Sequence, residues 1–391
     1  MKIANVEFQY LADDGIRDIG DGSQDALLVH VTMDDGSDGW GECEAAPLVS
    51  IAAWCCPMSH LACKPLKASV LDFEINEPKD IYALSDVVRR NSFDLLQADH
   101  TLSGIDIALW DMLGRKLGEP VWKLLGYQRA FPKVAYASQL FGDTPQQTYE
   151  KAVRSRKEGF RAAKFGWGPF GLGTVEEDCQ HIDAAREGLG PDLALMVDAG
   201  TVWKDDVSRA QAVVPKLQEC NVVWLEEPFA SGALKAYAGL AELPGCERLL
   251  AAGEGSHNPD MAYNLMDFGR LAFIQIDTGR IGGISSAKQV ADYAAQTDTT
   301  YVNHTFTTSL ALSASIQPFA GLEKSRWCEF PVESAPPSRL LTMVRILPDA
   351  NGEVILPDAP GLGVEINPET IARYGRKVEI HYEDKTIWSA K

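Results

Sequence analysis

The chain has 391 residues, of which 46% are hydrophobic and 23% are charged, a balance that can support a large core and more than one folded unit. Its formal net charge of −19 argues against nucleic acid and acidic membrane surfaces as partners, because both select stripes of Lys and Arg. A small anionic substrate is not excluded, since a bound cation can dominate the local field.

Neither a membrane span nor a secretory signal is indicated by this sequence. No stretch approaches the ~20 consecutive apolar residues of a membrane helix, and the opening MKIANVEFQY does not read as a signal peptide. We therefore expect a cytoplasmic protein. None of the eight cysteines falls into the C-x-x-C spacing of a zinc site, so we expect reduced, mostly buried thiols.

Residues 1–130 are predicted to form an α+β module. Alternating runs at 2–10, 26–33 and 40–47 indicate a small antiparallel sheet. The polar, glycine-rich residues 11–25 have the composition of a mobile loop. Helical periodicity then extends from about residue 80 to residue 125 and includes a glycine stop at Gly118.

Residues 131–330 repeat a different unit, in which a short β-prone run is followed by a helical stretch. This rhythm predicts a parallel α/β barrel. The alternative, an open doubly wound sheet, lacks its glycine-rich fingerprint here. Residues 331–391 are too polar for a core of their own, and we expect them to fold back on the first module. The eight runs are 134–138, 161–165, 193–198, 221–227, 248–254, 272–277, 299–304 and 325–330.

Five acidic residues and one histidine close six successive runs. They are 28, 28, 23, 27 and 25 residues apart, and in a barrel such strand ends converge on one face. One acid at a strand end is usually a helix cap, but so many carboxylates in one mouth would repel each other unless a cation neutralised them. The six residues are Asp198, Glu226, Glu254, Asp277, His304 and Glu329.

Asp198, Glu226 and Glu254 are the predicted metal ligands. Three oxygen donors suit a hard ion such as Mg²⁺, with Mn²⁺ as a second possibility, whereas zinc would recruit His or Cys. Glu227 is adjacent to Glu226, so strand alternation should turn it to the opposite side. The position of Glu226 in the repeat favours it as the inward residue.

His304 and Asp277 are expected to lie side by side and to act as a general acid or base pair, because a carboxylate on one imidazole nitrogen raises the basicity of the other. The plainer interpretation is a core histidine satisfied by an aspartate. Lys164 should face His304 across the mouth, as a carboxylate-binding cation or as a base. A surface lysine is its plainer interpretation.

In order along the chain, several short motifs resemble those of the enolase superfamily, in its mandelate racemase and muconate lactonizing enzyme branch. The resemblance implies a modified (β/α)₇β barrel and an N-terminal capping domain completed by the C-terminal segment. It also implies the metal ligands and the His–Asp pair named above, Glu329 as a hydrogen-bonding acid, and a substrate-covering loop near 13–25. The motifs are WGE at 40–42, GIDIALWD at 104–111, VDA at 197–199, LEEP at 225–228, GE at 253–254, QIDTGRIGG at 275–283, NH at 303–304, WCE at 327–329 and PGLGVE at 360–365.

One departure from the branch bears on the reaction. Racemases of the branch carry K-x-K at the end of the second strand, whereas this chain has Lys164–Phe165–Gly166. Without the second lysine, a single-base β-elimination by His304 is favoured. We therefore expect dehydration of an acid sugar, an aldonate or an aldarate, to a 2-keto-3-deoxy acid, with Lys164, Glu329 and Trp167 contacting the substrate.

Other functions stay open at this point. If Lys164 acts as a base on the second face, epimerisation, racemisation or lactone cycloisomerisation would use the same enediolate chemistry. A metal-dependent hydrolase is a distant alternative, because the first barrel run, VAYASQL, has no histidine ligand. A non-catalytic protein that kept the fold would have lost a metal ligand or the His–Asp pair. By analogy with similar barrels we expect a homo-oligomer.

Overall fold

A three-stranded antiparallel sheet opens the chain, as predicted. The computed structural model describes residues 1–44 and 46–390. Strands β1 (Ile3–Ala12), β2 (Asp25–Met33) and β3 (Asp38–Cys43) pair in that order. Helix α4 (Ala98–Leu117) packs closely on β3, because any side chain at Gly39 or Gly41 would collide with the α4 backbone. The WGE motif therefore has its glycine where sheet and helix touch.

In chain order, the helices of this module come after the antiparallel sheet and before the first barrel strand. Helix α4 ends at Gly118, which has a φ of 70°, as its glycine stop predicted. The other helices are α1 (Pro47–Cys55), α2 (Lys67–Val70), α3 (Pro78–Asn91) and α5 (Val121–Leu124).

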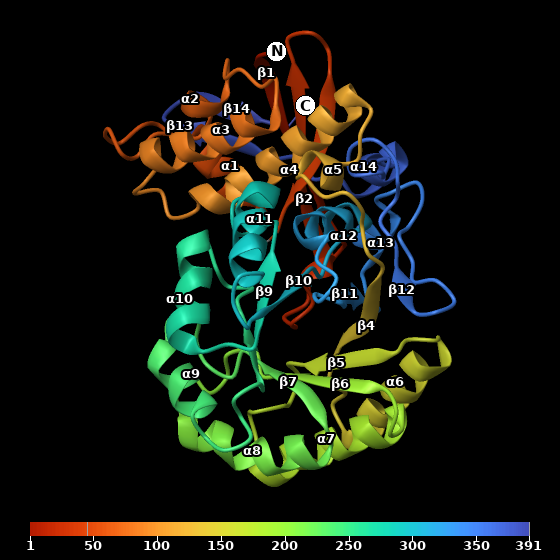
Figure 1. The fold of residues 1–391 in the computed structure, drawn as a ribbon. Coiled ribbons are helices and arrows are strands. Elements are labelled where there is room, and N and C mark those ends of the chain that lie inside the picture. Colours follow the sequence, from red (N-terminus) through yellow and green to blue (C-terminus); the bar gives the residue numbers. More distant parts are fainter. Residues whose placement is uncertain (45, 391) are drawn as a thin grey trace.

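Eight parallel strands form the predicted barrel (Figure 1). They are hydrogen-bonded in the order β10-β9-β8-β7-β6-β5-β4-β11, and the ends of this path, β10 and β11, lie next to each other, so the barrel is nearly closed. Every strand lies within one of the eight predicted runs or overlaps it. The strands are β4 (Lys133–Leu140), β5 (Ala162–Gly166), β6 (Ala194–Asp198), β7 (Val222–Glu226), β8 (Leu250–Ala252), β9 (Phe273–Asp277), β10 (Thr300–His304) and β11 (Trp327–Pro331).

Helices wrap the outside of the barrel, and a small apolar layer fills the inside. Tyr136 and Trp224 meet edge to face in this layer, with ring centroids 5.4 Å apart. The layer forms the floor beneath the strand ends. The outer helices are α6 (Pro145–Lys157), α7 (Val175–Leu189), α8 (Val207–Glu219), α9 (Leu234–Ala241), α10 (Pro259–Gly269), α11 (Gly283–Ala294) and α12 (Ser309–Ile316).

The C-terminal segment runs back over the first module. Arg376 donates to the carbonyls of Ala12 and Asp13 at the end of β1, each at 2.9 Å, and Ser338 donates to the Ser23 carbonyl at 2.7 Å. Strand β12 pairs with β4, so the segment also touches the barrel. These contacts agree with a capping module completed from the C-terminus, and the domain limits at 130 and 330 stay a prediction. The elements of the segment are α13 (Pro336–Leu340), β12 (Glu353–Val354), α14 (Pro368–Tyr374), β13 (Glu379–Tyr382) and β14 (Lys385–Ser389).

Among the helices that the structure describes, none is long and apolar enough to cross a membrane.

Candidate active site

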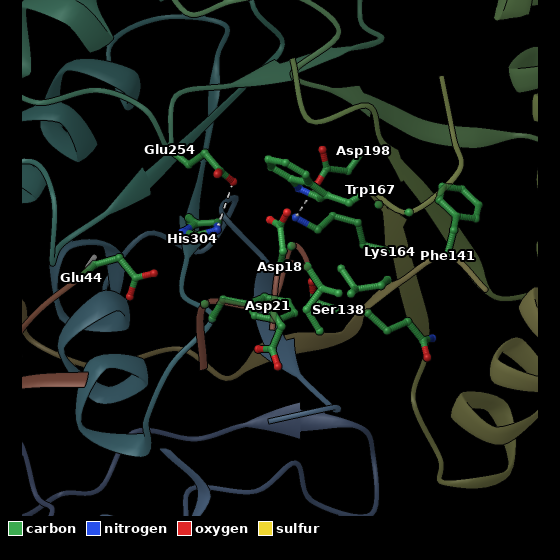
Figure 2. A pocket seen from close by; sticks show the side chains of 18 of the residues that line it. Asp18, Asp21, Glu44, Ser138, Phe141, Lys164, Trp167, Asp198, Glu254 and His304 are labelled. Atoms are coloured by element: carbon green, nitrogen blue, oxygen red, sulfur yellow. Dashed lines mark ion pairs between the residues drawn. The ribbon is translucent and has the colours of Figure 1, made fainter. Parts of the chain in front are cut away.

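A cavity of about 600 Å³ opens at the carboxyl ends of the barrel strands. The barrel supplies most of its wall, and the loop between β1 and β2 supplies another part, residues 18–22 (Figure 2). The wall includes five of the residues proposed from the sequence: Lys164, Trp167, Asp198, Glu254 and His304. The other three, Glu226, Asp277 and Glu329, are buried behind it and reach the wall through hydrogen bonds or ion pairs.

His304 and Asp277 form the expected pair. Their backbones are in register on β10 and β9, and His304 Nδ1 lies 2.7 Å from Asp277 Oδ2. This contact makes Nδ1 the protonated nitrogen and leaves Nε2, which is 3.0 Å from Glu254 Oε2, as the basic one. Burial opposes the charging of His304, but Glu254, Glu329 and the bond to Asp277 raise its pKa well above the ordinary value.

Lys164 is held among carboxylates. Its Nζ contacts Glu226 Oε1, lies 2.9 Å from Glu329 Oε1 and is 3.5 Å from Asp198 Oδ2. Burial opposes its charge, but these carboxylates, Glu226 first, raise the pKa of Lys164 well above its ordinary value. Glu329 is fixed in turn by Ser138 Oγ at 2.8 Å. Lys164 is therefore a cation in a set position on the cavity wall.

The three proposed metal ligands are engaged with cations and amide or indole donors. Asp198 and Glu226 are in register on β6 and β7, and Glu226 also accepts from Trp224 Nε1 at 2.9 Å and Gln275 Nε2 at 2.6 Å. Glu254 follows β8 by two residues and pairs with His304 and, at 3.3 Å, with Arg280. Within residues 1–44 and 46–390, no three acidic, His or Cys side chains stand close enough to enclose a metal ion.

The chemistry of these donors nevertheless fits a hard cation. All three side chains offer only oxygen. Burial and the charge of Glu226 raise the pKa of Asp198 well above its ordinary value, and burial likewise raises the pKa of Glu226. Carboxylates that disfavour each other's charge are the ones that a divalent ion would stabilise.

Arg280 and Glu44 also belong to the site, and the sequence prediction missed both. Arg280 Nη2 lies 3.2 Å from Glu44 Oε1, and Nη1 lies 3.3 Å from Glu254 Oε1. Burial, followed by the charge of Asp277, raises the pKa of Glu44 to about 7. Arg280 lies in the QIDTGRIGG motif, so the motif was the signal that could have found it, whereas no spacing relates Glu44 to the barrel repeat.

Two family models together cover most of the chain. The model described as "Enolase C-terminal domain-like" matches residues 147–370, and the model of the mandelate racemase / muconate lactonizing enzyme N-terminal domain matches residues 19–126. The chain belongs to the enolase superfamily, in its mandelate racemase and muconate lactonizing enzyme branch. Family members typically use a divalent metal and act on carboxylate substrates.

Similar proteins of this superfamily differ in reaction. The chain is 29% identical over 365 residues to D-galactarolactone cycloisomerase from Agrobacterium fabrum, covering 89% of this chain and 90% of the relative. It is 32% identical over 237 residues to L-talarate/galactarate dehydratase from Salmonella typhimurium, covering 59% of this chain and 56% of the relative. The crystal structure of a predicted mandelate racemase from Rhodobacter sphaeroides superposes with a TM-score of 0.95 at 52% identity, covering 100% of this chain and 99% of that one. Lyases and isomerases are thus both represented among the relatives of this enzyme.

Glu227, the second acid of the superfamily motif LEEP, is buried among the same carboxylates. Strand β7 ends at Glu226, and Glu227 has a left-handed φ of 42°, so strand alternation does not send it away from the site. Burial, followed by the charges of Glu254 and Asp198, raises its pKa well above the ordinary value. Among the described residues, Glu227 Oε1 has no hydrogen-bond partner.

Trp167 lines the cavity between the capping module and the barrel. Its φ is 54° and 44% of the residue is exposed. A Cβ added to Gly20 would lie 2.9 Å from the indole Cγ, and one added to Gly200 would lie 2.8 Å from Cε2. The ring therefore packs against the loop between β1 and β2, which was predicted to cover the substrate, and against the loop after β6, and both need glycine at the contact. Its role in substrate binding stays a prediction.

Proposed function

We propose that this enzyme is a Mg²⁺-dependent dehydratase of an acid sugar, with Mn²⁺ as an alternative ion. It would remove the proton α to the carboxylate and eliminate the β-hydroxyl to give a 2-keto-3-deoxy acid. Asp198, Glu226 and Glu254 would hold the ion, which when bound stabilises the negative charge that develops on the substrate carboxylate. The observation that carries the proposal is one imidazole base, His304, facing a lysine that carboxylates hold as a cation.

His304 performs both proton transfers in this scheme. Asp277 keeps the proton on Nδ1, so Nε2 takes the α-proton. The same proton then goes to the departing β-hydroxyl, which leaves as water while the electron pair of the C–H bond becomes the new double bond. The enol product tautomerises to the 2-keto acid, so the substrate loses one water and nothing is oxidised.

Lys164 binds rather than abstracts. Its contacts with Glu226 and Glu329 favour the charged form, which can pair with a substrate carboxylate oxygen but cannot accept a proton. Gly166 offers no second base at the position where racemases of the branch have one. A Cβ there would lie 2.7 Å from Asp198 Oδ2, so the backbone leaves little room for a side chain. This one-base arrangement favours elimination over racemisation.

The test is a screen of mono- and diacid sugars with Mg²⁺, with 2-keto acids detected by semicarbazide. A product that has lost one water supports dehydration. A product with the mass of its substrate would instead support cycloisomerisation or epimerisation, and the full-length similarity to a cycloisomerase makes that the second candidate. The variant His304→Asn should stay folded and lose turnover, and wild-type kcat in it would overturn the assignment. A homo-oligomer stays a prediction.

A further inference from the structure

The cavity wall is richer in carboxylates than the reaction needs. Among the described residues of the wall, Lys164 is the only lysine and Arg280 the only arginine. Lys164 forms ion pairs with Glu226 and Glu329. Arg280 forms ion pairs with Glu44 and Glu254. A second substrate carboxylate would therefore meet no uncommitted arginine or lysine. The acidic residues of the wall are Asp18, Asp21, Glu44, Asp143, Asp198 and Glu254.

Glu44 is the most constrained of the acids outside the proposed metal and proton-transfer groups. The residue is 4% exposed, and Arg280 binds its Oε1 at 3.2 Å. No described residue donates a hydrogen bond to its second oxygen, Oε2, so a buried acceptor on the cavity wall is left for a ligand. Gly22 of the covering loop lies against the same carboxylate, since a Cβ there would be 3.1 Å from Oε1.

Asp21 is held in the covering loop in a similar way. Its Oδ1 accepts from the backbone nitrogen and the hydroxyl of Ser23, at 2.8 and 2.6 Å. Among the described residues, its Oδ2 accepts no hydrogen bond, although the residue is 8% exposed. Figure 2 shows Asp21 and Glu44 on the side of the pocket away from Asp198, where the end of the substrate remote from the reacting carboxylate would lie.

We propose that Glu44 and Asp21 select monocarboxylic sugar acids, aldonates, over dicarboxylic ones. Their free oxygens accept hydrogen bonds from the hydroxyl groups at the remote end of the substrate, because each keeps lone pairs that no described residue uses. A carboxylate at that end has no proton to donate and is repelled by both residues. This inference rests on the proposed function and narrows its substrate class.

The covering loop offers one alternative partner for a second carboxylate. Arg17 is the single basic residue of loop 13–24. Its backbone is tied to Gln24 by hydrogen bonds of 2.8 and 3.0 Å, and it does not belong to the cavity wall. If the enzyme preferred diacids, Arg17 would be the residue that supplies a positive charge to the second carboxylate. The variant Arg17→Ala tests this, because it should then lose the preference for diacids.

The experiment compares kcat/KM for aldonate and aldarate pairs that share configuration at every stereocentre and differ only in the last carbon. In the wild-type enzyme the aldonate should be favoured by about tenfold or more, the effect of one like-charge contact in a partly buried site. The ratio should narrow toward one in Glu44→Gln and in Asp21→Asn. Using the ratio within each variant cancels any general loss of rate.

Asp14→Asn is the matched control, because it removes the same charge from the same loop at a side chain that is 97% exposed and outside the cavity. Its aldonate preference should equal that of the wild type. The inference is overturned if the wild-type enzyme prefers the aldarate, above all if Arg17→Ala abolishes that preference. It is also overturned if the aldonate-to-aldarate ratio of kcat/KM is unchanged in both Glu44→Gln and Asp21→Asn. Absence of α-proton exchange in D₂O with every acid would instead overturn the proposed function, so the two failures are distinguishable.

Discussion

His304 and Asp277 sit at directly paired positions on two neighbouring parallel strands, with Nδ1 and Oδ2 2.7 Å apart. The backbone nitrogen of Gly279 also donates to Asp277, at 2.6 Å, so the carboxylate is fixed from two sides. The geometry ties the tautomer of the base to the register of the sheet.

Asp277→Asn should lower kcat by about 10²–10⁴-fold, because an amide no longer stabilises the imidazolium or enforces the productive tautomer. KM should change little, since Asp277 lies behind the cavity wall. The measurement is kcat together with the rate of α-proton exchange in D₂O. Asp292→Asn is the control, because its side chain is half exposed and, within the described part of the chain, forms its ion pair with Lys288. Equal kcat in the two variants would contradict the assigned role of Asp277.

Lys164→Met should destabilise the fold by about 3–5 kcal/mol, because it leaves buried carboxylates without their cation. The side chain is 4% exposed and touches both Glu226 and Glu329, which are fully buried. Urea unfolding in the presence of a chelator measures this loss without a contribution from bound metal. In Lys123→Met, which removes a lysine paired at the surface with Glu119, stability should barely change. If both variants unfold at the same urea concentration, Lys164 does not neutralise the buried cluster.

Most of the barrel could be predicted from the sequence because it repeats. Strands β6, β7, β9 and β10 end in a polar residue, and parallel strands bring those ends together. Glu44 could not be predicted in this way, because its partner, Arg280, is 236 residues away in the sequence and no repeat period relates the two. The orientation of Glu227 was predicted wrongly for a different reason. Side chains alternate between the two faces only within a strand, and β7 ends one residue before Glu227.

Glu42 should make the stability of the protein depend on pH. It accepts a hydrogen bond from Thr308, and its Oε1 has no partner among the described residues. Burial raises its pKa from 4.5 to about 8. Between these values the unfolded chain releases a proton that the native state keeps, so the free energy of unfolding falls as pH rises through this window.

Glu42→Gln removes that titration, so the loss of stability between pH 5 and pH 8 should be smaller in the variant, by an amount on the order of 2–4 kcal/mol. Urea unfolding at the two pH values is the measurement. Glu74→Gln, at an exposed position, serves as the control and should follow the wild type. A pH dependence in Glu42→Gln as steep as in the control would show that Glu42 is ionised in the native state.

Gly166→Ala should impair catalysis even though it adds one methyl group. Gly166 and Asp198 are in register on β5 and β6, and the new Cβ would lie 2.7 Å from Asp198 Oδ2. Displacing this carboxylate moves a proposed metal ligand, and a shift of about 1 Å in a catalytic group can cost on the order of 10²-fold in rate. The apparent affinity for Mg²⁺ should fall as well, which isothermal titration calorimetry measures without turnover. At Gly232 an added Cβ would meet no atom of another described residue within 4 Å, so Gly232→Ala should keep both properties. For the same steric reason, Gly166→Lys should not create a racemase. If that variant forms the epimer of an α-hydroxy acid, the site accommodates a second base.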